Sequence, residues 1–253
     1  RDKIKSYAST VMYETIDDYM KIIDKKMKEG FEAVKFHTWC IPDKDIELAK
    51  EARKNFPKMS FMLDVENNYN FENSLKVAQE LEKLEFTWFE APMIDYELEN
   101  YKKLNEKVDI KIIPSGNWIM DLKIFEHIIR NKIWKASRTD MAMMGGISMA
   151  KEAINISENA GIDCEIMSWG YTLPSVTNLH LMLSTNNCTY FEQPLPYDSF
   201  EFGMHDVLRT NSDGYMYAPK KNGLGVEINW DVMKSKTIYS FQCDNNKKIK
   251  DIS

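Results

Sequence analysis

The sequence is poor in the residues that mark several common classes of protein. Its 253 residues include only 10 glycines, which cluster only at Gly145-Gly146 and in the Gly223-Leu224-Gly225 turn. Neither cluster has the spacing of a dinucleotide-binding or nucleotide-phosphate loop, so we expect no such loop. The four cysteines stand far apart, at positions 40, 164, 188 and 243, and form no CxxC pair. This pattern argues against a zinc site or a disulfide framework.

An excess of positive charge and a long apolar run are also missing. The formal net charge is −6 at pH 7, whereas nucleic acids and anionic membranes select basic surfaces. No apolar run approaches the length that spans a bilayer. We therefore expect a soluble cytoplasmic protein with no nucleic-acid and no membrane partner. A chain of this length can bury a substantial core.

The sequence does contain a regular alternation of short and long segments. Short β-branched or aromatic runs are separated by longer stretches with helical periodicity. The predicted strands are Ile4–Ser9, Ala33–Trp39, Ser60–Val65, Phe86–Phe89, Lys111–Pro114, Trp134–Arg138, Asp163–Met167 and Cys188–Gln193. The predicted helices are Ile16–Glu29, Asp43–Phe56, Asn70–Leu84, Asp95–Asn105, Asp121–Asn131, Ser148–Ala160 and Pro174–Ser184.

Eight strands alternating with helices predict an α/β fold, a (β/α)8 barrel of the TIM type. A doubly wound open sheet is the alternative. That fold usually has fewer strands and often a glycine-rich first turn, which this chain lacks. We expect the barrel to occupy residues 4–214 and a return segment with a tail to occupy residues 215–253.

Oxygen-bearing side chains stand at the ends of three consecutive predicted strands. They are Asp64, Glu90 and Asn117, separated by 26 residues (64 to 90) and 27 residues (90 to 117). In a barrel the strand carboxyl ends meet at one mouth, so these side chains converge. Hard oxygen ligands that leave positions for water and substrate suit Mg²⁺. Each residue alone could instead cap the following helix, but three equivalent positions favour a site.

Lys35 and His37 end the second predicted strand. Residues two apart share a strand face, so both side chains are expected to point into the barrel mouth. The ordinary pKa of histidine lies near neutrality, so His37 can act as a general base. The alternative for His37 is a hydrogen-bonded interior histidine. A buried Lys35 would be costly without an anionic partner, which also favours a site here.

Together these motifs resemble the enolase superfamily, in its mandelate racemase-like branch. Asp64 in LDVENNY, Glu90 in WFEAP and Asn117 in PSGNW resemble the three metal ligands of that family. An asparagine as the third ligand resembles the glucarate dehydratase group. The resemblance implies a Mg²⁺ cofactor held by these residues, in the barrel domain of an enzyme similar to acid-sugar dehydratases.

The resemblance covers nearly the whole chain. It extends from Ser6 to about Met233 and includes RTDxxxxGG at 138–146 and NGLGVEI at 222–228. Each motif alone is weak, but the set is specific. Relatives carry an N-terminal α+β capping domain that closes over the mouth. This chain begins almost at the first barrel strand, so we expect the capping domain to be absent from it.

The resemblance also implies roles for single residues. Relatives usually carry two lysines at the end of the second strand; here His37 replaces the second, so the expected base is His37 or else Lys35. Glu192 resembles the strand-eight acid that hydrogen-bonds the substrate carboxylate, with a salt-bridged rim acid as the alternative. Asp140 matches a carboxylate that orients a histidine on strand seven. That histidine is absent, and Met167 stands in its place, which leaves Asp140 without its expected partner.

Further residues are expected near the mouth. Arg138 shares a strand face with Asp140, so it is expected either to neutralise that acid or to contact substrate. Glu66 is expected to contact substrate hydroxyls or to face solvent, and Trp169 to contact substrate. Glu165 lies on the inward face of its strand and is expected to add another acid to the mouth.

The missing strand-seven histidine favours chemistry that needs only one base. The predicted reaction is abstraction of the proton α to a carboxylate, followed by loss of the β-hydroxyl, which converts an acid sugar to a 2-keto-3-deoxy acid. The alternatives are a racemase, epimerase or cycloisomerase of the same superfamily, or a catalytically silent metal-binding barrel. The expected partners are a small-molecule carboxylate substrate and further copies of the chain in a homo-oligomer.

Overall fold

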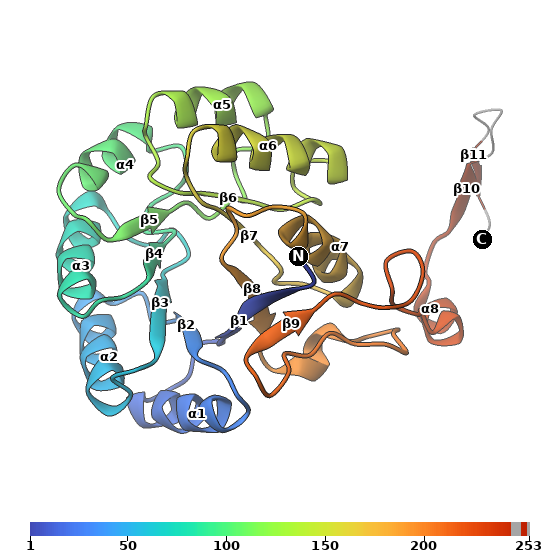
Figure 1. The fold of residues 1–253 in the computed structure, drawn as a ribbon, viewed down its shortest axis with the longest axis horizontal. Coiled ribbons are helices and arrows are strands. Elements are labelled where there is room, and N and C mark those ends of the chain that lie inside the picture. Colours follow the sequence, from blue (N-terminus) through green and yellow to red (C-terminus); the bar gives the residue numbers. More distant parts are fainter. Residues whose placement is uncertain (244–248, 252–253) are drawn as a thin grey trace.

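A computed structural model of the protein describes residues 1–243 and 249–251. Strands and helices alternate around a barrel whose helices lie on the outside (Figure 1). The barrel strands are β1 (Lys3–Ser9), β2 (Ala33–His37), β3 (Ser60–Asp64), β4 (Trp88–Glu90), β5 (Lys111–Ile113), β6 (Ser137–Thr139), β7 (Cys164–Ile166) and β8 (Tyr190–Pro194). The helices between them are α1 (Ile16–Lys28), α2 (Pro42–Asn55), α3 (Phe71–Lys83), α4 (Leu98–Asn105), α5 (Leu122–Arg130), α6 (Ile147–Asn159) and α7 (Thr172–Leu183). The predicted α/β barrel is confirmed.

The barrel strands are parallel. Strands β5, β4, β3, β2, β1 and β8 pair in that order, and β6 pairs with β7. A backbone hydrogen bond from Cys164 to Asn187 joins β7 to the residues before β8. The last barrel strand thus lies beside the first, and all strand carboxyl ends open on one side of the molecule.

Each predicted helix and strand is present, although some boundaries differ. Strand β6 begins at Ser137 and not at Trp134, because the Trp134 ring packs outside the barrel. Its indole meets Tyr101 and Phe125 edge-to-face, with centroid distances of 6.4 and 6.0 Å. Trp134 thus fills apolar space between helices. In the sequence, an aromatic residue with this role is easily mistaken for the first residue of a strand.

The barrel interior begins with an apolar layer near the amino ends of the strands. Its members are Tyr7, Ala33, Met62, Trp88, Ile113 and Ala136, which come from β1 to β5 and from the residue just before β6. A larger apolar core fills the space between the strands and the surrounding helices. Because side chains alternate along a strand, the residue two positions after each member of the apolar layer also faces inward, one layer closer to the mouth.

The chain continues past β8 through a short 3₁₀ helix, Tyr197–Phe200, to β9 (Tyr215–Tyr217), which pairs antiparallel with β1. Helix α8 (Trp230–Lys236) and the strand pair β10 (Phe241–Cys243) and β11 (Ile249–Asp251) follow. The predicted return segment and tail includes residues 244–248 and 252–253, which lie outside the described residues. Within the described part of the chain, none of the helices has both the length and the apolar character needed to cross a membrane.

Candidate active site

The inward-facing layer above the apolar one is polar. Each member stands two residues after an apolar inward-facing residue and shares its strand face. The buried members are Ser9, Lys35, Asp64, Glu90, Ser115, Arg138 and Glu192. Most of them line a cavity of about 200 Å³, together with His37, Glu66, Asn67, Asn117, Met167 and Trp169. The residues predicted to lie at the mouth therefore line this one cavity, except Asp140 and Glu165.

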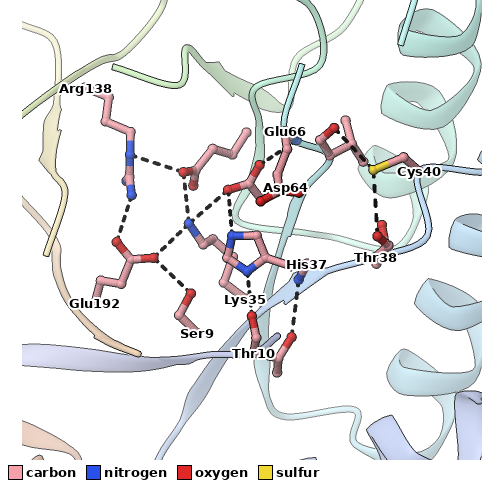
Figure 2. Close-up of polar contacts among 12 residues, drawn as sticks. Ser9, Thr10, Lys35, His37, Thr38, Cys40, Asp64, Glu66, Arg138 and Glu192 are labelled. Carbon is pink, nitrogen blue, oxygen red and sulfur yellow. Dashed lines mark hydrogen bonds and ion pairs between the residues drawn. The ribbon is translucent and has the colours of Figure 1, made fainter. Parts of the chain in front are cut away.

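Lys35 is the centre of an ion-pair network at the floor of the cavity (Figure 2). Its Nζ lies 3.2 Å from Asp64 Oδ2, 2.9 Å from Glu90 Oε1 and 2.9 Å from Glu192 Oε1. Burial alone would lower the pKa of Lys35, but Glu192 and Glu90 outweigh it and hold that pKa well above its usual value. Lys35 is thus held as an ammonium ion in this arrangement, and its role as the alternative base stays a prediction.

Arg138 joins two of the same acids from the other side. Its Nε lies 3.1 Å from Glu90 Oε1 and its Nη2 lies 2.9 Å from Glu192 Oε2. The alternative in which Arg138 neutralises Asp140 is therefore wrong. Gly116, with φ +77°, makes room for this arginine, because a Cβ at that position would lie 3.0 Å from Arg138 Cγ.

Glu192 is completely buried, so the alternative of a rim acid is wrong for it. Its Oε1 accepts a hydrogen bond from Ser9 Oγ at 2.9 Å, and its Oε2 accepts one from the Ser168 backbone N–H at 3.3 Å. Burial raises the pKa of Glu192, but Lys35 and Arg138 outweigh burial and lower it to about 2. The carboxylate is therefore ionised and fixed in position.

His37 is held by contacts at both ring nitrogens. Its Nδ1 lies 2.6 Å from the Thr10 carbonyl oxygen, and its Nε2 lies 3.2 Å from Asp64 Oδ2. A carbonyl can only accept, so Nδ1 carries a proton, and the Nε2 atom is the one that can gain or lose a proton. Burial lowers the pKa of His37, but Asp64 outweighs it and the net pKa is raised. The Trp169 ring lies beside this imidazole, with centroids 4.9 Å apart.

The three predicted metal ligands lie at the ends of β3 and β4 and in the loop after β5. Asp64 and Glu90 are buried, and Asn117 is exposed to the cavity. Burial raises the pKa of Glu90 to about 7 despite Arg138 and Lys35. Burial also acts to raise the pKa of Asp64, but Lys35 and His37 outweigh it, and the net pKa is lowered.

The donor chemistry of these residues fits a divalent cation. Two carboxylates and an amide oxygen are hard ligands, and a cation, the Lys35 ammonium, already lies within 3.2 Å of both carboxylates. Within the described residues, no group of three His, Cys, Asp or Glu side chains meets in a geometry that could hold a metal. Asn117, which lines the same cavity, could supply a third oxygen donor beside the two carboxylates.

A buried aspartate supports the loop that carries Asn117. Asp95 accepts hydrogen bonds from the backbone N–H and the hydroxyl of Ser115 at 2.8 and 2.9 Å, and from the Gly116 N–H at 3.1 Å. Ser115 Oγ in turn accepts a hydrogen bond from the Asn117 N–H at 3.2 Å. Asp95 therefore fixes the backbone that positions the third candidate ligand.

Replacing Asp95 with alanine is expected to lower the free energy of unfolding by at least about 2 kcal/mol, because three buried donors lose their acceptor. Urea denaturation measures the change. Asp121 is the matched control, since it accepts hydrogen bonds from two backbone N–H groups at the exposed start of α5. Asp121→Ala is expected to cost about 1 kcal/mol. Equal effects of the two substitutions would contradict a special role for Asp95.

Asp140 lies outside the cavity lining. Its Oδ2 accepts a hydrogen bond from Asn178 Nδ2 on α7, and its Oδ1 accepts from the backbone N–H groups of Ala142 and Met143. The expected strand-seven histidine is absent, as the sequence indicates, and Asn178 bonds Asp140 instead. These bonds fix the loop after β6, so the structure gives Asp140 a structural role in place of the predicted catalytic one.

The Glu165 side chain does face the barrel interior, but it lies closer to the amino ends of the strands than the cavity at the mouth does. Its carboxylate accepts hydrogen bonds from the backbone N–H and the hydroxyl of Thr189, which precedes β8. The prediction that it adds an acid to the mouth is wrong. Alternation along a strand determines whether a side chain faces the barrel interior. The distance of that side chain from the mouth depends on how far along β7 its residue stands.

Two further groups, which were not predicted from the sequence, orient the site. Trp88 Nε1 donates to Glu90 Oε2 at 3.0 Å, and the two residues stand two apart in the WFE motif, so their shared strand face could have indicated this bond. The Thr10 carbonyl that fixes the His37 ring is a backbone group. No residue type signals its position, so only the fold could reveal it.

The family of this barrel follows from a comparison with known families. Residues 18–232 match the family described as enolase C-terminal domain-like. The chain belongs to the enolase superfamily. The resemblance inferred from the sequence motifs is thus confirmed.

Solved and curated relatives support this family assignment. A Pseudovibrio sp. protein described as a mandelate racemase/muconate lactonizing enzyme is 37% identical, with a TM-score of 0.92, and the match covers 94% of this chain and 64% of that one. D-glucarate dehydratase from Agrobacterium tumefaciens, complexed with magnesium, is 26% identical, with a TM-score of 0.85 and coverage of 93% and 65%. The o-succinylbenzoate synthase of Listeria innocua is 25% identical over 94% of this chain and 63% of its own length.

The enolase-superfamily chain thus spans 63% to 65% of the length of these relatives. They include a dehydratase and a synthase, so membership identifies a superfamily of enzymes without singling out one reaction. The choice among reactions depends on the residues of the site itself.

Proposed function

We propose that the protein carrying this chain catalyses magnesium-dependent abstraction of a proton α to a carboxylate, and that it dehydrates an acid sugar to a 2-keto-3-deoxy acid. The observation that carries the proposal is the convergence of Asp64, Glu90 and Asn117 with the His37 imidazole at one cavity. The similarity to a magnesium-bound D-glucarate dehydratase supports it. A bound magnesium ion would supply positive charge where negative charge develops on the substrate carboxylate.

His37 is the proposed base. The Nδ1–H bond to the Thr10 carbonyl holds the ring so that Nε2 faces the cavity floor, and in the neutral imidazole the Nε2 lone pair is available for a proton. Lys35 remains protonated and offers positive charge to the substrate carboxylate. Glu192 and Arg138 hold each other and keep Lys35 in place.

Dehydration is favoured over racemisation because proton transfer on two substrate faces needs two bases. Strand β7 continues into Met167 and Trp169, which line the cavity and carry no base, while Asp140 is bound to Asn178. A single base suffices for dehydration, because after it removes the α-proton its conjugate acid can protonate the β-hydroxyl, which leaves as water. The racemase, epimerase and cycloisomerase alternatives remain distinguishable because they release no water.

A screen of acid sugars with Mg²⁺, scored for 2-keto acid formation, tests the proposal on the full-length protein. We expect turnover of at least one acid sugar and its loss, by at least about a thousandfold, in the Asp64→Ala variant. Solvent deuterium incorporation without loss of water would support an isomerase instead. If the protein binds Mg²⁺ but neither turns over substrate nor exchanges an α-proton, the silent metal-binding barrel is correct.

A further inference from the structure

Each carboxylate oxygen of the two acidic metal ligands already has a hydrogen-bond or ion-pair partner. Asp64 Oδ1 accepts from the Glu66 backbone N–H at 2.9 Å, and Asp64 Oδ2 lies 3.2 Å from Lys35 Nζ. Glu90 Oε1 lies 2.9 Å from the same Nζ, and Glu90 Oε2 accepts from Trp88 Nε1 at 3.0 Å. A metal ion that binds both acids therefore either shares these oxygens with their existing partners or displaces one of them.

Among the described residues, Lys35 is the cation that contacts both acidic ligands. Trp88 and Arg138 reach Glu90 alone, and His37 reaches Asp64 alone. A magnesium ion held by both acids would lie close to the Lys35 ammonium, because both cations would bind the same two carboxylates. Two cations this close repel strongly in a buried site, so they exclude each other from this position.

Besides Asp64 and Glu90, Lys35 has a third ion-pair partner, the Glu192 carboxylate. Glu192 Oε1 lies 2.9 Å from Nζ, is completely buried and is not one of the proposed metal ligands. The Arg138 and Ser9 contacts keep Glu192 in place on the far side of the ammonium. The lysine stem is flexible, so Nζ can leave the two ligands without leaving Glu192.

The charge balance of the cluster points the same way. Three buried carboxylates (Asp64, Glu90 and Glu192) face two buried cations (Lys35 and Arg138), so the cluster has one net negative charge when all three carboxylates are ionised and His37 is neutral. A divalent cation reverses this to one net positive charge. A single substrate carboxylate then restores neutrality, which a buried site requires.

We propose that the Lys35 ammonium is an internal counter-ion that occupies the metal position in the metal-free protein, and that metal binding moves it onto Glu192, where it meets the substrate carboxylate. This inference rests on the magnesium site of the proposed function. It makes metal and substrate binding ordered, because the ammonium becomes available to substrate only after the metal has displaced it.

Calorimetric titration of the full-length protein with MgCl₂ tests the inference without any substrate. Lys35→Met removes the competing cation, so we expect Mg²⁺ to bind about tenfold or more tightly than in the unsubstituted protein. Lys111→Met is the matched control, because Lys111 pairs with Asp163 away from the cavity and its loss should leave the affinity unchanged. An unchanged or weaker affinity in folded Lys35→Met protein overturns the inference.

A crystal structure of the unsubstituted protein with Mg²⁺ gives a second test that does not depend on a variant folding. We expect Lys35 Nζ beyond hydrogen-bond distance of Asp64 and Glu90 but still bonded to Glu192. An ammonium that stays on both ligands beside the metal overturns the inference and leaves the proposed function intact. If Mg²⁺ binds neither the unsubstituted protein nor Lys35→Met, the magnesium site and the inference fail together.

Discussion

Replacing Arg138 with methionine is expected to lower the free energy of unfolding by about 3–5 kcal/mol, because it removes one cation from a buried cluster of three carboxylates. Arg138 is 3% exposed and pairs with both Glu90 and Glu192. Methionine fills much of the same volume, so the loss reports charge more than packing. Urea denaturation at neutral pH measures the change.

The destabilisation in Arg138→Met should grow as the pH rises. Burial already raises the pKa of Glu90 to about 7 from an ordinary value of 4.5, and removal of Arg138 raises it further. A raised carboxyl pKa means that the folded state binds a proton that the unfolded state has released, so folding loses stability as the pH increases above 4.5. The two proteins should therefore differ less at acid pH than at pH 8.

Two further variants complete the Arg138 experiment. Arg130→Met removes an exposed arginine that pairs with Glu126 on α5, and it should change stability by less than about 0.5 kcal/mol. Adding Glu90→Gln to Arg138→Met should recover part of the loss, since it removes one of the negative charges left in excess when Lys35 alone faces three carboxylates. A pH-independent loss below about 1 kcal/mol would contradict this account of the cluster.

Replacing His37 with asparagine is expected to slow α-proton exchange by about 10²–10⁴-fold, the usual contribution of a positioned general base. Asparagine keeps a donor near Asp64 but cannot accept the proton. NMR of the exchange of the substrate α-proton with deuterated solvent measures proton abstraction directly. This measurement does not depend on whether the β-hydroxyl is lost afterwards. Magnesium affinity should change by less than about tenfold, because the ligands themselves remain.

The pH profile distinguishes a base from a structural histidine. Only the unprotonated Nε2 can accept a proton, so the rate should fall as the pH decreases through the pKa of His37, which Asp64 raises above 6.5 in the metal-free protein. His37→Asn should lose this acid limb. His127→Asn, on the outer helix α5, should keep both the rate and the profile. An acid limb that persists in His37→Asn would assign the base to another group.

Much of the fold and the site could be predicted from local patterns. The alternation of strands and helices predicts the barrel, and the ends of β2, β3 and β4 place Lys35, Asp64 and Glu90 at its mouth. The predictions failed where they depended on the distance of a side chain from the barrel mouth or on its partners in distant parts of the chain. Glu165 faces the barrel interior but lies too far below the mouth to line the cavity. Asp140 contacts Asn178, which follows it by 38 residues and stands on helix α7.

By itself the sequence determined which side chains face the barrel interior, because alternation along a strand is a local property of the chain. It also carried the motifs that identify the superfamily. Only the tertiary structure decided which charges neutralise one another. Lys35 meets carboxylates from β3, β4 and β8, and Arg138 joins two of them, across as many as 157 residues of sequence (35 to 192). Such pairing depends on distances between strands, and the closed barrel sets these distances.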